Sequence, residues 1–101
     1  QLTNIIEENF SNPELSVDFL ANRMGISRSG LYAKIKTLAN VTPNELIQLT
    51  RLKKAAKLLA ENKYRINEIC YMVGFNSSSY FSKCFQRQFG IKPGEFTPHS
   101  L

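Results

Sequence analysis

Apolar residues recur at every third or fourth position along nearly the whole chain, and glycine and proline are sparse. This spacing predicts a succession of amphipathic helices. The first such face is formed by Leu2, Ile5, Ile6 and Phe10. We therefore predict an all-α fold of about seven helices.

Polar and glycine residues that start or stop helices divide this pattern. Ser16 and Ser27 each precede an apolar-periodic stretch and are suited to cap a helix. Gly25 and Asn40 follow these stretches and tolerate the left-handed conformation that ends helices. The two predicted helices carry Val17, Leu20 and Met24, and Leu31, Ile35 and Leu38, as their apolar faces.

The clearest local signal is Thr42-Pro43-Asn44-Glu45. Threonine at the N-cap, proline in the first turn and glutamate three residues after the cap make a capping box. A long helix is expected to follow and to end around Glu61-Asn62. Its apolar side carries Leu46, Leu49, Leu52, Ala56 and Leu59, and its other sides carry Arg51, Lys53, Lys54 and Lys57.

The pattern then repeats. At an offset of 49 residues, Gly25 matches Gly74, and at an offset of 50, Pro43-x-Glu45 matches Pro93-x-Glu95, with apolar positions aligned between them. Each repeat predicts a helix, a short turn and a second helix, which is the helix-turn-helix unit. The predicted organisation is a first subdomain over 1–41, a linker helix over 42–62 and a second subdomain over 63–101.

The second repeat shows how such a unit is built. Gly74 supplies the turn, Phe75 inserts into the core and Asn76 is expected to cap the next helix. Phe81, Phe85 and Phe89 are spaced by four and are expected to face inward.

The distribution of charge along the chain indicates what kind of partner the domain binds. The formal net charge of the 101 residues is +5, but residues 1–22 contain four acidic residues and no lysine or arginine. The remainder holds 13 basic and four acidic residues, a balance of +9. This asymmetry favours a polyanionic partner, although a solvated basic surface has the same composition.

Other classes of chemistry find little support. Cys70 and Cys84 lie in no metal-ligand spacing and are expected to be small buried hydrophobes. His99 has no second histidine or carboxylate pair beside it, so neither an enzyme nor a cofactor or metal site is predicted. No apolar run approaches the ~18–20 residues of a membrane span and no signal peptide is apparent, so a cytoplasmic location without membrane contact is expected.

In a helix-turn-helix the second helix enters the major groove of DNA, and residues near its start meet base edges. Arginine, lysine and serine can hydrogen-bond to bases, whereas tyrosine and alanine can pack on a thymine methyl. The candidate base contacts are Arg28, Ser29, Tyr32, Ala33, Ser78, Ser79, Tyr80 and Lys83. The candidate phosphate contacts are Ser27, Lys36, Arg51, Lys54, Ser77, Arg87 and Lys92.

These residues leave alternatives open. Helical hairpins in enzymes resemble a single helix-turn-helix, and Tyr32 and Tyr80 are also suited to packing. A helical module that docks an acidic protein is the main alternative to a DNA-binding domain. RNA binding is disfavoured because no aromatic platform on strands is apparent.

The chain, and most specifically residues 15–96, resembles the DNA-binding domain of the AraC/XylS transcription regulators. The matching stretches are "LSVDFLANRMGISRSGLYAKIK", "TPNELIQLTRLKKAAKLL", "INEICYMVGFNSSSYFSKCFQRQFGIKP" and "GEF". The resemblance implies two helix-turn-helix subdomains joined by a long helix, with both recognition helices in successive major grooves. It assigns base contacts to Ser29, Tyr32, Ala33, Ser78, Ser79, Tyr80 and Lys83.

Two departures from the family pattern stand out. Thr97 occupies a position where the family usually has arginine, and Arg65 replaces a small polar cap, which predicts a weaker helix start there. The stretch "NPELSVDFLANRMGISRSGLYAKIK" is most similar to output domains of Bacteroides-type hybrid two-component sensors. That similarity implies upstream sensor, kinase and receiver domains and the transcription machinery as partners.

Overall fold

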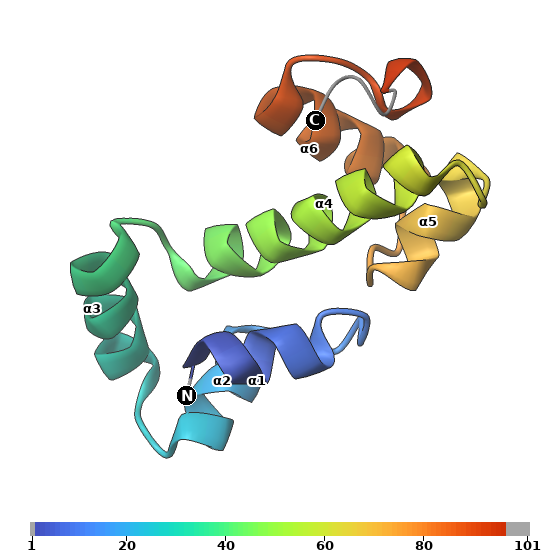
Figure 1. Cartoon of the computed structure of the whole chain (residues 1–101). Coiled ribbons are helices and arrows are strands. Elements are labelled where there is room, and N and C mark those ends of the chain that lie inside the picture. Colours follow the sequence, from blue (N-terminus) through green and yellow to red (C-terminus); the bar gives the residue numbers. More distant parts are fainter. Residues whose placement is uncertain (1, 97–101) are drawn as a thin grey trace.

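The computed structural model describes residues 2–96 and, within them, contains six α-helices, one 3-10 helix and no strand (Figure 1). The predicted all-α fold of about seven helices is confirmed. The elements are α1 (Leu2–Asn9), α2 (Val17–Met24), α3 (Arg28–Ala39), α4 (Pro43–Glu61), α5 (Ile66–Met72), α6 (Ser78–Phe89) and the 3-10 helix η1 (Pro93–Glu95).

The predicted helix starts are formed by side-chain caps. The hydroxyl of Ser16 accepts a hydrogen bond from the Phe19 backbone N–H at 3.2 Å, and that of Ser27 accepts one from Gly30 at 3.1 Å. Thr42 and Glu45 form the predicted capping box: Thr42 Oγ1 accepts from the Glu45 N–H at 3.1 Å, and Glu45 Oε1 accepts from the Thr42 N–H at 2.8 Å. These bonds satisfy backbone donors that a helix start leaves without partners.

The predicted helix ends are also confirmed. Gly25, Asn40 and Asn62 follow α2, α3 and α4 in the left-handed conformation, with φ of 70°, 57° and 56°. At the start of α5, Arg65 supplies no capping side-chain bond, whereas Glu68 Oε1 accepts from its backbone N–H at 2.8 Å. The glutamate therefore supports this start where the sequence predicts a weaker one.

Two expectations about single residues are wrong. Ser77, not Asn76, caps α6, because its hydroxyl accepts from the Tyr80 N–H at 3.2 Å and the helix begins one residue later than expected. Leu38 is 70% exposed although it continues the apolar face of α3. It lies in the last turn of that helix.

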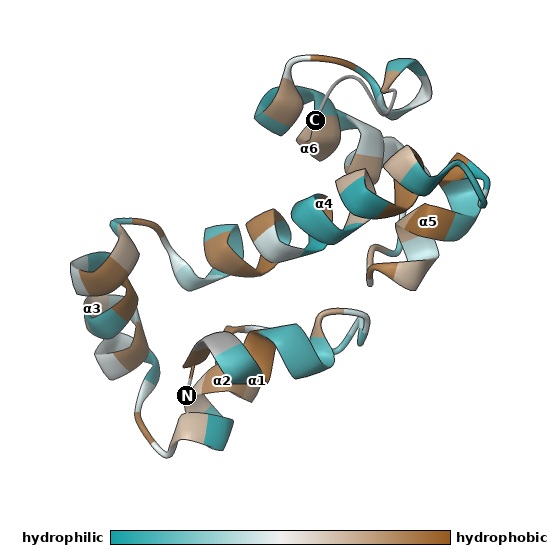
Figure 2. Cartoon of the chain, viewed as in Figure 1, coloured by the Kyte–Doolittle hydropathy of each residue, from teal (hydrophilic) through white to brown (hydrophobic). Residues whose placement is uncertain are grey.

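Two hydrophobic cores lie along α4. The first gathers Leu2, Ile6, Leu15, Val17, Leu20, Ala21, Leu31, Ile35 and Ile47. The second gathers Leu52, Ala55, Ala56, Ile69, Cys70, Val73, Phe75, Phe81, Cys84, Phe85 and Phe96. Because α4 contributes residues to both, it connects α1–α3 with α5, α6 and η1, as Figure 1 shows. Hydrophobic and hydrophilic segments alternate along it in Figure 2, as expected of a helix with buried and exposed faces.

Aromatic rings fill the second core. The Phe81 ring centroid lies 5.2 Å from that of Phe75 and 5.8 Å from that of Phe85, and the Phe96 ring meets Phe85 edge-on at 5.3 Å. Phe89 is half-buried and packs on the same group. The predicted inward face of α6 is confirmed, so its opposite face is left to solvent.

Arg51 corrects the prediction that it stands on the outward surface of α4 as a phosphate contact. It is 9% exposed, and its Nε and Nη2 atoms donate to the backbone oxygens of Phe10 at 2.9 Å and Asn12 at 2.8 Å. Burial lowers the pKa of its guanidinium. The physical reason for the correction is that the Phe10 carbonyl, just after α1, needs a donor in this partly buried place. The guanidinium also adds a second donor to the Asn12 carbonyl, which already accepts from the Leu15 N–H at 3.0 Å.

Candidate nucleic-acid interface

The first turn of α3 presents short polar side chains and an arginine. Ser27 and Ser29 are exposed, and their hydroxyl oxygens lie 3.3 Å apart. Arg28 Nη1 donates to Asp18 Oδ1 of α2 at 2.7 Å, and this hydrogen bond, then the charge of Asp18, raises the pKa of Arg28. The predicted contact residue Arg28 is therefore available from solvent but already engaged with a carboxylate.

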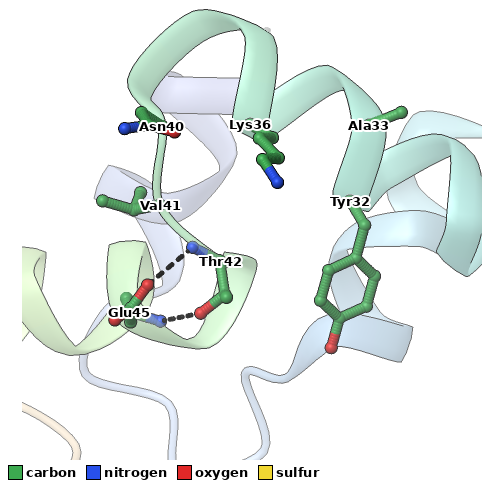
Figure 3. Close-up of a pocket in the computed structure, with 7 residues that line it drawn as sticks. All are labelled: Tyr32, Ala33, Lys36, Asn40, Val41, Thr42 and Glu45. Carbon is green, nitrogen blue, oxygen red and sulfur yellow. Dashed lines mark hydrogen bonds between the residues drawn. The ribbon is translucent and has the colours of Figure 1, made fainter.

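Further along α3, Tyr32, Ala33 and Lys36 are exposed, as predicted. They line a hollow of about 440 Å³ whose other wall is formed by Asn40, Val41, Thr42 and Glu45. In Figure 3, Tyr32 and Lys36 lie one turn apart on α3, and the bonded Thr42–Glu45 pair closes the hollow at the start of α4. This surface offers an aromatic face, a methyl group and an ammonium to a ligand.

On α6, Ser79, Lys83 and Arg87 are exposed, whereas Ser78 is half-buried. Tyr80 is 47% exposed. Its ring centroid lies 6.1 Å from that of Phe75, and its hydroxyl accepts a hydrogen bond from Gln48 Nε2 of α4 at 2.6 Å. Tyr80 therefore combines packing with a solvent-facing edge.

The predicted phosphate contacts fall into three groups. Lys36, Arg87 and Lys92 are exposed, and the hydroxyls of Ser27 and Ser77 cap α3 and α6. Lys54 is half-buried, pairs with Glu7 at 2.8 Å and lies 5.4 Å from the Phe10 ring centroid. Arg51 is removed from the set by the bonds described above.

Sequence reasoning missed Gln48 and Asp18, whose side chains hold two of the candidate residues. A signal for Gln48 was present, since it lies four residues before the buried Leu52 and thus beside the buried face of α4. The same spacing links Arg51 to the buried Ile47 and Ala55. For neither Gln48 nor Asp18 did the sequence indicate the partner, because Tyr80 and Arg28 lie on other helices.

Metal-binding groups, membrane-spanning helices and reactive cysteines would each indicate a different kind of site. Among the residues that it describes, no group of three or more histidine, cysteine or acidic side chains could hold a metal ion, and no helix is both long and apolar enough to cross a bilayer. Cys70 and Cys84 are buried free thiols, and burial raises the pKa of Cys70. Thr97 and His99 lie outside the described residues.

Sequence comparison places this chain among regulators. A family model described as a helix-turn-helix domain matches residues 20–98. The histidine kinase P4 of Formosa agariphila is 48% identical over 92 residues, which are 91% of this chain and 7% of the kinase. The transcriptional activator AggR of Escherichia coli is 32% identical over 96 residues, or 95% of this chain and 36% of AggR. The chain thus spans a minor part of both relatives.

Structure comparison gives the same picture. The C-terminal domain of AraT, a response regulator from Geobacillus stearothermophilus, superimposes with a TM-score of 0.90 at 27% identity, covering 99% of this chain and 82% of that one. The DNA-binding domain of the global transcriptional factor AdpA, solved in complex with a target DNA, gives 0.86 at 25% identity over 92% and 83% of the two chains.

Proposed function

The chain belongs to the AraC-type helix-turn-helix family of transcription-regulator domains, and we propose that it binds double-stranded DNA through α3 and α6, placed in successive major grooves. The observation that carries the proposal is the family match over residues 20–98, which spans both helices with their exposed polar faces. The family is one of DNA-binding domains, so the domain is not an enzyme.

The division into a subdomain over 1–41, a linker over 42–62 and a subdomain over 63–101 is part of this proposal. The two hydrophobic cores and the shared helix α4 support it. Base contacts are assigned to Arg28, Ser29, Tyr32, Ala33, Ser78, Ser79, Tyr80 and Lys83. Phosphate contacts are assigned to Ser27, Lys36, Ser77, Arg87 and Lys92, with a smaller contribution from Lys54 because Glu7 already neutralises it.

The domain is further proposed to be the output part of a two-component regulator with sensor, kinase and receiver domains upstream. Two similarities support this context: one relative is named a histidine kinase, of which this chain matches 7%, and AraT is a response regulator. Contact with the transcription machinery and a cytoplasmic location follow from such a role.

A binding-site selection from a random DNA library tests the proposal, using the parent and Lys83→Ala, Tyr32→Ala and Arg87→Ala. The exposed residues of α3 and α6 differ, so we expect an asymmetric site with two halves about one helical turn, roughly 34 Å, apart. Lys83→Ala should relax preference in one half by about 1–3 kcal/mol, and Tyr32→Ala should relax the other half. Arg87→Ala should weaken all sequences about equally and lower the salt slope by about one unit.

Lys57→Ala is the matched control, because it removes one exposed positive charge of α4 that has no assigned contact. Two results would contradict the model of two reading helices. In one, Lys83→Ala and Tyr32→Ala alter the same base positions. In the other, the parent selects no sequence and its binding does not weaken with salt, which would favour the alternative of a module that docks an acidic protein.

A further inference from the structure

Gln48 connects the linker helix with the second recognition helix through both ends of its amide group. Its Nε2 donates to the Tyr80 hydroxyl at 2.6 Å, and its Oε1 accepts from Cys84 Sγ at 3.9 Å. Cys84 is 3% exposed, so its thiol lies in the core beside the amide oxygen. In this orientation of the amide, its nitrogen faces Tyr80.

This bond decides what Tyr80 can offer to a ligand. A phenol has one O–H donor and an oxygen that accepts. Because Gln48 is a donor at this contact, the Tyr80 oxygen is the acceptor and its own proton is directed elsewhere. The ring also packs near Phe75, at 6.1 Å between centroids, so both the ring and its tip are held. Tyr80 remains 47% exposed, and its free O–H is the polar group that it presents.

We propose that Gln48 is a positioning residue that makes Tyr80 a fixed hydrogen-bond donor to a base edge in the major groove. The inference rests on the proposed function and deepens it. Guanine offers N7 and O6 as acceptors, adenine offers N7 and thymine offers O4, whereas cytosine presents its N4 amino donor. The base that Tyr80 contacts is therefore guanine, adenine or thymine, and cytosine is disfavoured at that position.

The test is the base preference at each position of the selected site, measured for the parent, Tyr80→Phe, Gln48→Met and the double variant. Methionine matches the length of glutamine and has no donor. Tyr80→Phe should reduce the discrimination against cytosine at one position by roughly 2- to 10-fold, the range of one net hydrogen bond. Gln48→Met should reduce it at the same position, and adding it to Tyr80→Phe should change nothing further.

Gln48→Glu provides a sharper arm. An ionised carboxylate can only accept hydrogen bonds, so the Tyr80 O–H would donate to the new carboxylate in the variant and no longer face the base. The loss of discrimination should be at least as large as in Tyr80→Phe. The added negative charge will also weaken binding to every sequence. Gln88→Glu is the matched control for that effect, because Gln88 lines the same groove between α4 and α6 as Gln48.

The outcomes separate the inference from the proposed function. If the parent selects no DNA sequence, the proposed function fails and this inference fails with it. If the parent selects a site that Tyr80→Phe or Gln48→Met leaves unchanged, only the inference fails. It also fails if Gln48→Met retains its full effect in the Tyr80→Phe background or lowers affinity equally at all positions, since either result would indicate a structural role. Thermal unfolding of each variant shows whether the fold is retained.

Discussion

Gly25 and Gly74 occupy matching places in the two repeats, but their surroundings differ. Both have positive φ, of 70° and 100°. A Cβ atom at Gly25 would meet nothing within 4 Å, whereas one at Gly74 would lie 2.4 Å from the Phe10 carbonyl oxygen and 2.8 Å from Arg51 Nε. Gly74 is therefore required both by its left-handed backbone and by the close packing around it. Gly25 is required only by its left-handed backbone.

We expect Gly74→Ala to destabilise the domain far more than Gly25→Ala. Left-handed backbone costs a non-glycine residue roughly 1–2 kcal/mol, and this cost applies to both variants. Gly74→Ala must also displace the bond from Arg51 Nε to the Phe10 carbonyl, and a buried carbonyl left without a partner costs about 1–3 kcal/mol. Chemical denaturation of the two variants beside the parent measures the difference. Equal losses of stability would show that the junction between Arg51, Phe10 and Gly74 contributes nothing.

At the scale of a helix, α4 carries the coupling between the two cores, and Leu52 is its test position. Leu52 is 4% exposed and belongs to the second core. Leu52→Ala should lower the free energy of unfolding by ~2–5 kcal/mol, because it removes buried surface and leaves a cavity. DNA binding should weaken as well, since the second core holds α6 in place.

Leu38→Ala is the control for this prediction. Leu38 is 70% exposed, so its truncation should change stability by less than about 0.5 kcal/mol. A Leu52→Ala domain with parental stability and DNA affinity would show that α4 does not couple the two cores.

Helices, caps and apolar faces could be predicted from the sequence because their causes are local. Ser16, Ser27 and Thr42 each act on a backbone N–H three residues away, and the Phe81–Phe85 face follows helical spacing. What escaped prediction depends on contacts between distant segments. Arg51 donates hydrogen bonds to carbonyls about 40 positions earlier in the chain. Its charge alone wrongly suggested that its side chain lies on the outer surface of α4.

The candidate site divides in the same way. The exposure of Ser79 and Lys83 follows from helical spacing, because both lie opposite the buried face of α6. Tyr32 and Lys36 lie to one side of the buried face of α3, so their exposure follows in the same way. The partners of Arg28 and Tyr80 could not be predicted, since Asp18 and Gln48 lie on other helices, 10 and 32 positions away. Sequence therefore predicts which side chains are displayed but not what holds them.

The length of the whole molecule sets the distance between the two half-sites that it can contact, and changing that distance in the DNA tests this. Its longest extent is 39 Å, and the 19 residues of α4 span roughly 28 Å. Inserting five base pairs between the two half-sites turns one half to the opposite face of the duplex, since a turn takes about 10–10.5 base pairs. We expect affinity to fall by roughly 100-fold or more, because linked modules lose their avidity when they cannot engage together.

Five base pairs inserted outside the site serve as the control for this measurement and should leave affinity unchanged. An equal affinity for the parental and the lengthened site would show that one recognition helix suffices or that α4 bends freely.

The continuous helix α4 also constrains how such a domain can diverge. Each residue added to an α-helix turns everything beyond it by about 100° and moves it by about 1.5 Å. An insertion in α4 would therefore misdirect α6, whereas substitutions on the exposed faces of α3 and α6 leave the frame intact. We expect descendants of this domain to acquire new target sequences by point substitution while they inherit the distance between half-sites unchanged. Promoters under their control would then vary in base sequence more readily than in spacing.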